Sequence, residues 1–204
     1  MLSPGQGEQR PAPAFAVLAV ASSAGGISAL RTLLGALSKD FPVPVLVVQH
    51  LDPRHETILP EVLARKTTLW VKLAEDGEHM TAGVVYIAPP NRHLLIGPGG
   101  NLSLSETELV HFVRPSADLL FESVAAHFPD RAVAVVLTGS GADGAMGVQA
   151  IKARNGTVIV QDPEDAEFTG MPRSAVETNT ADFVLALDEI GPVVRRLFEP
   201  EAHR

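Results

Sequence analysis

Three polar side chains in this sequence have the types that nucleophilic hydrolysis requires. Ser23, His50 and Asp143 each follow a run of apolar, largely β-branched residues. A serine hydroxyl is a weak nucleophile until a neighbouring imidazole takes its proton, and that imidazole needs a carboxylate to orient it. The three residues therefore predict a Ser-His-Asp triad that cleaves a carboxylic ester or a closely related acyl bond.

The serine lies in a turn whose composition fits this chemistry. Ser23 precedes Gly25 and Gly26 at the start of a predicted helix. Unpaired N–H groups and the positive end of the helix dipole can stabilise an oxyanion there, and one such donor contributes about 3 kcal/mol. Ser22 is the neighbouring alternative to Ser23.

Each of the three residues also has an ordinary structural interpretation. The turn at 22–26 is typical of a helix cap or a phosphate-binding loop, His50 of a partly buried histidine, and Asp143 of an N-cap. These interpretations are independent of one another. Their coincidence at one edge of a sheet, argued next, is what favours the triad.

Short apolar runs alternate with longer amphipathic ones along the chain, which predicts strands alternating with helices. The expected strands lie at 14–20, 43–49, 84–88, 132–138, 157–161 and 182–187, and the expected helices at 27–37, 57–66, 116–128, 144–154 and 189–198. Most of the strands are apolar throughout, as in strands buried on both faces. We therefore predict an α/β fold with a doubly wound, mainly parallel sheet and helices on both faces. The glycine-rich stretch at 97–100 predicts a small inserted β-hairpin.

This topology explains how distant residues could meet. In open parallel sheets the reactive crevice lies beyond the carboxyl ends of the strands. Ser23, His50 and Asp143 follow the strands predicted at 14–20, 43–49 and 132–138. We therefore expect all three at the same edge of the sheet.

Composition excludes several other classes of function. The chain has no cysteine, so thiol catalysis and cysteine-bound metals are excluded, and its net charge of -8 argues against nucleic-acid partners. The histidines lack the compact spacing of a metal site, and no glycine-rich loop matches a nucleotide-binding motif, so we expect no cofactor and no metal. No apolar run is long enough to cross a bilayer, and residues 1–13 read as a flexible tail before a single domain at 14–204. We expect a cytoplasmic protein without direct membrane insertion.

At these residues the chain resembles the catalytic domain of the CheB family, the chemoreceptor glutamate methylesterases of bacterial chemotaxis. The likeness runs in family order from about residue 15 to residue 195, through the segments 21–26, 48–51, 86–90, 114–118, 137–145 and 170–173. The order Ser, His, Asp along the chain differs from the Ser, Asp, His order of ordinary α/β-hydrolases. Ala21 and Ser140 depart from the residues most common in the family.

The resemblance implies hydrolysis of γ-glutamyl methyl esters on the cytoplasmic helices of chemoreceptors, with deamidation of certain glutamines as a second reaction. Carried over by position, the nucleophile is Ser23, the general base His50 and the orienting carboxylate Asp143. The receiver domain of typical members has no counterpart in residues 1–13, so we do not expect control by phosphorylation within this chain. Two alternatives remain open: a stand-alone esterase for another substrate, and a signalling module that binds without catalysis.

Overall fold

A computed structural model of the chain describes residues 16–51 and 56–198. The tail predicted at 1–13 and the outer ends of the predicted domain lie outside these residues. Within them no helix is both long and apolar enough to span a membrane.

Seven parallel strands form the main sheet, in the order β3-β4-β2-β1-β7-β8-β9. They are β1 (Val17–Ser22), β2 (Val45–Gln49), β3 (Trp70–Leu73), β4 (Val84–Ile87), β7 (Ala132–Val136), β8 (Thr157–Gln161) and β9 (Phe183–Leu185). Strand β1 lies at the centre; the chain places β2, β3 and β4 on one side of it and then β7, β8 and β9 on the other. The carboxyl ends of β2, β1 and β7 are consequently neighbours, which makes this edge the topological switch point.

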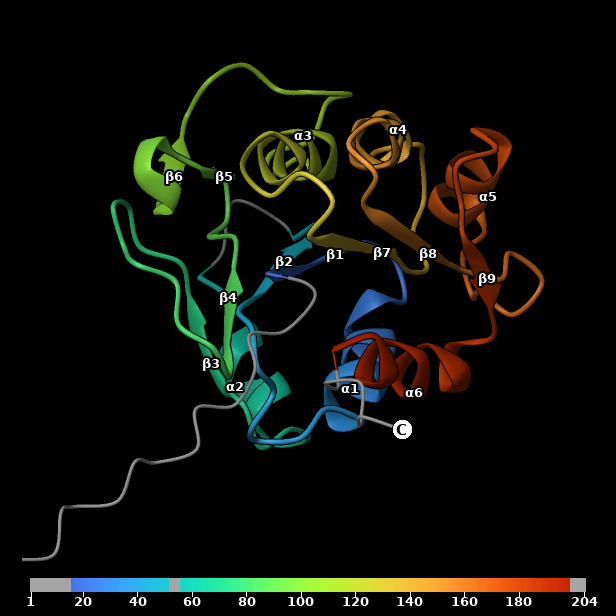
Figure 1. The fold of residues 1–204 in the computed structure, drawn as a ribbon, viewed down its shortest axis with the longest axis horizontal. Coiled ribbons are helices and arrows are strands. Elements are labelled where there is room, and N and C mark those ends of the chain that lie inside the picture. The colour runs from blue at the N-terminus through green and yellow to red at the C-terminus, as the bar shows by residue number, and fades with distance from the viewer. Residues whose placement is uncertain (1–15, 52–55, 199–204) are drawn as a thin grey trace, which may run out of the picture.

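Helices cover both faces of the sheet (Figure 1). One face carries α3 (Ala117–His127), α4 (Ala145–Ala153) and α5 (Gly170–Glu177), and the other carries α1 (Gly26–Gly35), α2 (Leu59–Ala64) and α6 (Leu187–Phe198). Successive residues of a strand point to opposite faces. In β1, accordingly, Val17 and Ala19 join the core under α3 and α4, whereas Leu18 and Val20 join the core over α1 and α6. The doubly wound α/β prediction is confirmed.

The predicted hairpin is also present. Strands β5 (His93–Ile96) and β6 (Leu102–Ser105) pair in antiparallel fashion, with the short 3-10 helix η1 (Pro98–Gly100) between them. Leu94, Ile96 and Leu102 bury their side chains in the core that contains α3. The hairpin therefore packs against α3, the helix whose first residues contact the site described below.

Two elements were missed from the sequence. Strand β3 lies at the edge of the sheet with its residues partly or fully exposed, so its sequence Trp-Val-Lys-Leu lacks the apolar run that marked the inner strands. Helix α5 begins with Gly-Met-Pro and has low mean hydropathy. The helix predicted at 57–66 and the strand predicted at 182–187 are also shorter than expected, since the structure has them at Leu59–Ala64 and Phe183–Leu185.

Candidate active site

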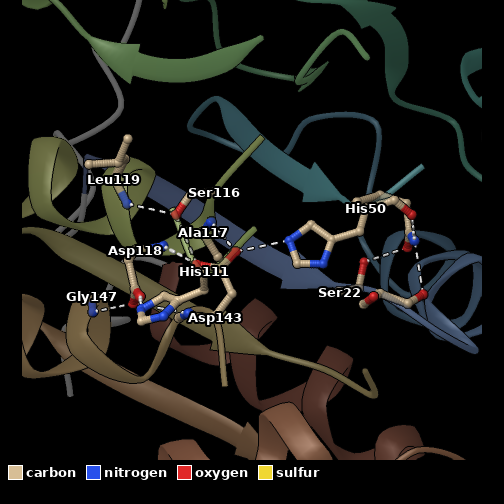
Figure 2. Close-up of polar contacts among 12 residues, drawn as sticks. Ser22, His50, His111, Ser116, Ala117, Asp118, Leu119, Asp143 and Gly147 are labelled. Atoms are coloured by element: carbon tan, nitrogen blue, oxygen red, sulfur yellow. Dashed lines mark hydrogen bonds and ion pairs between the residues drawn. The ribbon is translucent and has the colours of Figure 1, made fainter. Parts of the chain in front are cut away.

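Two of the predicted triad residues are in direct contact. His50 follows β2, Asp143 lies in the loop between β7 and α4, and His50 Nε2 is 2.9 Å from Asp143 Oδ2 (Figure 2). The side chain of His50 is 13% exposed, while that of Asp143 is 3% exposed. The structure thus joins residues 93 positions apart into one buried polar pair that opens to solvent at the imidazole.

Asp143 is held by a full set of donors. Besides His50, its carboxylate accepts hydrogen bonds from Ser116 Oγ at 2.8 Å, from Ala117 N at 2.6 Å and from Asp118 N at 3.1 Å. Burial by itself raises the pKa of a carboxyl group. Here the bonds from His50, Ala117 and Asp118 outweigh burial, so the pKa of Asp143 is lowered from its ordinary value. The group is therefore held as a carboxylate.

A second buried carboxylate, that of Asp118, accepts hydrogen bonds from the segment that follows Asp143. Asp118, in the first turn of α3, accepts hydrogen bonds through Oδ1 from Gly144 N at 2.9 Å and Gly147 N at 2.7 Å. Asp143 thus caps the start of α3, and Asp118 caps the start of α4. Such reciprocal capping locks the two helix starts together, so the position of Asp143 depends on both helices.

The other oxygen of Asp118 has a different neighbour. Asp118 Oδ2 is buried without a hydrogen bond among the described residues, and His111 Nε2 lies 3.4 Å away (Figure 2). Burial first, and then the nearby Asp143 carboxylate, raise the pKa of Asp118, although the N–H groups of Gly147 and Gly144 lower it. Two neighbouring carboxylates thus have opposite pKa shifts, because Asp143 receives a side-chain hydrogen bond from His50.

The two candidate serines have different surroundings. Ser22, the last residue of β1, is fully buried, and its hydroxyl donates to Gln49 Oε1 at 2.8 Å. Ser23 is partly exposed and lines a pocket of about 600 Å³ together with His50. A nucleophile must be accessible to substrate and close to its base, and only Ser23 of the two serines lines this pocket beside His50. The structure therefore supports Ser23 over Ser22.

The hydrogen bond expected between Ser23 and His50 is not formed. No described residue is hydrogen-bonded to the Ser23 hydroxyl, although the backbone N–H of Ser23 donates to Thr138 O at 3.1 Å. Contacts between a nucleophile and its base are often loose before substrate binds and tighten in the reacting complex. The structure therefore brings His50 and Asp143 into contact and places Ser23 in the same pocket.

Gln49 is the residue that links these parts, and sequence reasoning gave it no role. It is 3% exposed, and its Nε2 donates to Ser23 O at 2.8 Å and to His50 O at 2.9 Å. A polar residue at the end of an otherwise apolar strand was the available signal. Asp118 also had no role predicted from the sequence; it lies in the segment 114–118, which takes part in the family resemblance.

Two glycines allow the serine turn to approach Gln49. Gly25 has φ of +73°, a conformation that side chains rarely adopt, and a Cβ on Gly26 would lie 2.2 Å from Gln49 Oε1. Any larger residue at 26 would push Gln49 away from Ser22. Glycine is thus required at 25 by the backbone conformation and at 26 by the close approach of Gln49.

Arg114 is part of the scaffold. Its guanidinium donates to Asn91 Oδ1 and to the carbonyl oxygens of Glu106 and Thr107. Among the described residues, no group of three or more His, Asp or Glu side chains is arranged to hold a metal ion.

Comparison with known proteins agrees with this architecture. Residues 18–194 match the family model described as CheB methylesterase. A relative from Leptospira interrogans is 40% identical over 183 residues, which cover 90% of this chain and 95% of the relative. The protein-glutamate methylesterase/protein-glutamine glutaminase 2 of Caulobacter vibrioides is 37% identical over 90% of this chain, and the match spans 54% of that longer protein.

A solved structure gives the same result for the fold. The crystal structure of the Thermotoga maritima CheB methylesterase catalytic domain superposes with a TM-score of 0.86 at 36% identity, covering 90% of this chain and 98% of that one. The match includes the sheet that positions His50 and Asp143. This chain belongs to the CheB methylesterase family.

Proposed function

We propose that the chain is a protein-glutamate methylesterase that hydrolyses γ-methyl esters of glutamate side chains on the cytoplasmic helices of chemoreceptors. The contact between His50 and Asp143, beside a pocket that Ser23 lines, carries this proposal. Family membership supports it, as do relatives named protein-glutamate methylesterase in Caulobacter vibrioides and Myxococcus xanthus. In this proposal the protein acts in the cytoplasm.

The contact with Asp143 supports one assignment of the two ring nitrogens of His50. An ionised carboxylate only accepts hydrogen bonds, so Nε2, which faces Asp143, carries the proton. The lone pair then lies on Nδ1, since a neutral imidazole has one donor and one acceptor nitrogen. His50 Nδ1 is therefore the atom that takes the proton from Ser23 as the serine attacks the ester carbonyl.

The start of α1 supplies donors for the charge that develops. Ala24 and Gly25 line the pocket, and their N–H groups have no acceptor among the described residues. They and the positive end of the α1 dipole would stabilise the oxyanion of the tetrahedral intermediate. Collapse of that intermediate releases methanol and leaves an acyl group on Ser23, which water then hydrolyses with His50 again as base.

The same acyl-enzyme can form from an amide. Attack on a glutamine side chain releases ammonia, and hydrolysis of the acyl-enzyme again gives glutamate. The name protein-glutamine glutaminase, borne by the Caulobacter relative, supports this second reaction. We propose deamidation as a slower activity of the same site, because an amine is a poorer leaving group than an alcohol.

Methanol release from methyl-labelled chemoreceptor tests the proposal, with Ser22→Ala as the matched control for Ser23→Ala. We expect Ser23→Ala to lose activity about 10⁴-fold or more, because the nucleophile is absent. Ser22→Ala should retain activity within about tenfold, because the Ser22 hydroxyl is buried against Gln49. The reverse pattern would assign the nucleophile to Ser22.

Two further outcomes would change the conclusion. Hydrolysis of a nitrophenyl ester without action on receptor would indicate an esterase for another substrate. Absence of both activities, with no labelling of Ser23 by a fluorophosphonate, would indicate a signalling module that binds without catalysis.

A further inference from the structure

A charged residue that the mechanism does not use lines the pocket of Ser23 and His50. Glu167 lies in the loop between β8 and α5, and it is the only carboxylate or ammonium-bearing side chain among the described residues that line this pocket. Its carboxylate is close to the serine turn, since a Cβ on Gly25 would lie 2.8 Å from Glu167 Oε2. The negative charge therefore sits beside the N–H groups proposed to bind the oxyanion.

The loop that carries Glu167 is fastened to the site. Thr138, directly after β7, donates through Oγ1 to Ala24 O at 3.1 Å and accepts from Phe168 N at 2.8 Å. Gly139 N donates to Phe168 O at 3.0 Å. Thr138 thus links the residue that follows Ser23 to the residue that follows Glu167, so the backbone holds Glu167 beside the nucleophile.

The loop is anchored on its other side as well. Ala166 is buried, and Asp165 Oδ2 accepts from Gln161 Nε2 and from Leu187 N, both at 2.9 Å. The side chain of Asp165 is thereby engaged away from the pocket. Glu167 is consequently the carboxylate that this loop presents to an incoming substrate.

Reactant and product of ester hydrolysis differ in charge at the reacting group. A methyl ester or a primary amide is neutral, whereas the glutamate product is an anion. A fixed carboxylate within several Å of a second negative charge disfavours binding of that charge, and in a solvated pocket the effect is several-fold in affinity. It acts much less on the neutral reactant.

We propose that Glu167 is a specificity-determining residue that selects uncharged acyl groups and rejects anionic ones, the hydrolysed product included. This inference rests on the proposed esterase function of the same pocket. It predicts that substrates with a negative charge near the ester are poor, and that product carboxylate leaves the site readily.

Two esters of equal chain length measure this preference: 4-nitrophenyl hexanoate, which is neutral, and the 4-nitrophenyl monoester of adipate, which ends in a carboxylate. The quantity compared is the ratio of kcat/KM for the adipate monoester to kcat/KM for the hexanoate, after subtraction of spontaneous hydrolysis. Any effect of Glu167 on the oxyanion is common to both esters and cancels in the ratio.

We expect Glu167→Gln to raise the ratio about three- to tenfold and Glu167→Lys to raise it further, with both effects shrinking at high salt. Glu164→Gln is the matched control, because Glu164 is an exposed carboxylate of the same loop that does not line the pocket. It should leave the ratio unchanged. Thermal unfolding of each variant verifies that the fold is retained.

Each other outcome overturns the inference. A ratio within twofold of wild type in both Glu167 variants, with the hexanoate still hydrolysed, would reject the role of Glu167 and leave the esterase function intact. An equal rise in Glu164→Gln would mean that net charge alone acts. If the wild-type protein hydrolyses neither ester and also releases no methanol from methyl-labelled receptor, the proposed function fails, and the specificity role fails with it.

Discussion

The carboxylate side and the serine side of this site are held by different kinds of contact. Asp143 is buried and accepts four hydrogen bonds, one from His50 and three from the start of α3. The Ser23 hydroxyl is bonded to no described residue, and only its backbone is tied down, through Thr138 and Gln49. In the proposed mechanism, His50 and Asp143 are thus positioned before substrate arrives, while the Ser23 hydroxyl keeps the freedom to turn toward an acyl carbon.

The difference in hydrogen bonding between Asp143 and Ser23 fits the different roles proposed for them in catalysis. A group that orients a base must not move during the reaction, so buried hydrogen bonds suit Asp143. A nucleophile must rotate from imidazole to substrate, so an open pocket suits Ser23. Substitutions on the two sides should therefore differ in whether they affect activity, stability or both.

The largest expected effect breaks the carboxylate side. Asp143→Asn replaces an acceptor by an amide that can present its NH₂ to His50, so the ring can adopt the wrong tautomer, and the loss of charge removes the stabilisation of the imidazolium. We expect kcat to fall about 10³- to 10⁴-fold. Steady-state hydrolysis of a nitrophenyl ester measures this, and circular dichroism verifies the fold. A loss below tenfold would show that Asp143 does not orient the base.

The next effect tests the reciprocal capping. Asp118→Ala leaves the N–H groups of Gly144 and Gly147 without their acceptor, and we expect the free energy of unfolding to fall by about 1–3 kcal/mol. Asp118→Asn keeps an oxygen acceptor and removes a buried charge, so its loss should be clearly smaller. Urea unfolding compares the two variants. Equal losses would mean that the charge of Asp118, and not its hydrogen bonds, stabilises the fold.

A smaller effect is expected on the serine side. Ser22→Ala removes the donor to the buried Gln49 Oε1, and we expect about 1 kcal/mol of destabilisation. Ser38→Ala is the matched control, because Ser38 is exposed and its side chain forms no hydrogen bond with a described residue. If both variants unfold at the same urea concentration as wild type, the link from Ser22 to Gln49 contributes nothing to stability.

The smallest effect concerns pH. The pKa of Asp143 is lower in the folded protein than its ordinary value of 3.8, so its charge stabilises the fold above about pH 4, and this contribution is lost as the pH falls through the folded-state pKa. The difference in Tm between wild type and Asp143→Asn should therefore be constant near neutral pH and shrink below about pH 4. A difference that stays constant down to pH 2.5 would contradict the lowered pKa.

Sequence patterns predicted the sheet well where strands are buried on both faces. The runs at 43–49 and 132–138 contain the observed strands β2 and β7, and the glycines at 97–100 marked the hairpin. Edge strand β3 was missed, because a strand that is exposed on its outer side needs no continuous apolar run. Helix α5 was missed because its first turn contains Gly170 and Pro172, which disfavour a helix, and because its burial depends on contacts with β7 and β8.

The sequence by itself determined which chemistry was available: one serine turn, one histidine and one aspartate, each at the end of an apolar run. Periodicity and topology rules then placed all three at one edge, because parallel strands end there together. Tertiary structure alone decided how they are held. Hydrogen bonds from Ser116 and Ala117 to Asp143, the capping by Asp118 and the approach of Glu167 to Gly25 all join segments far apart in the chain, and no local pattern encodes such distances.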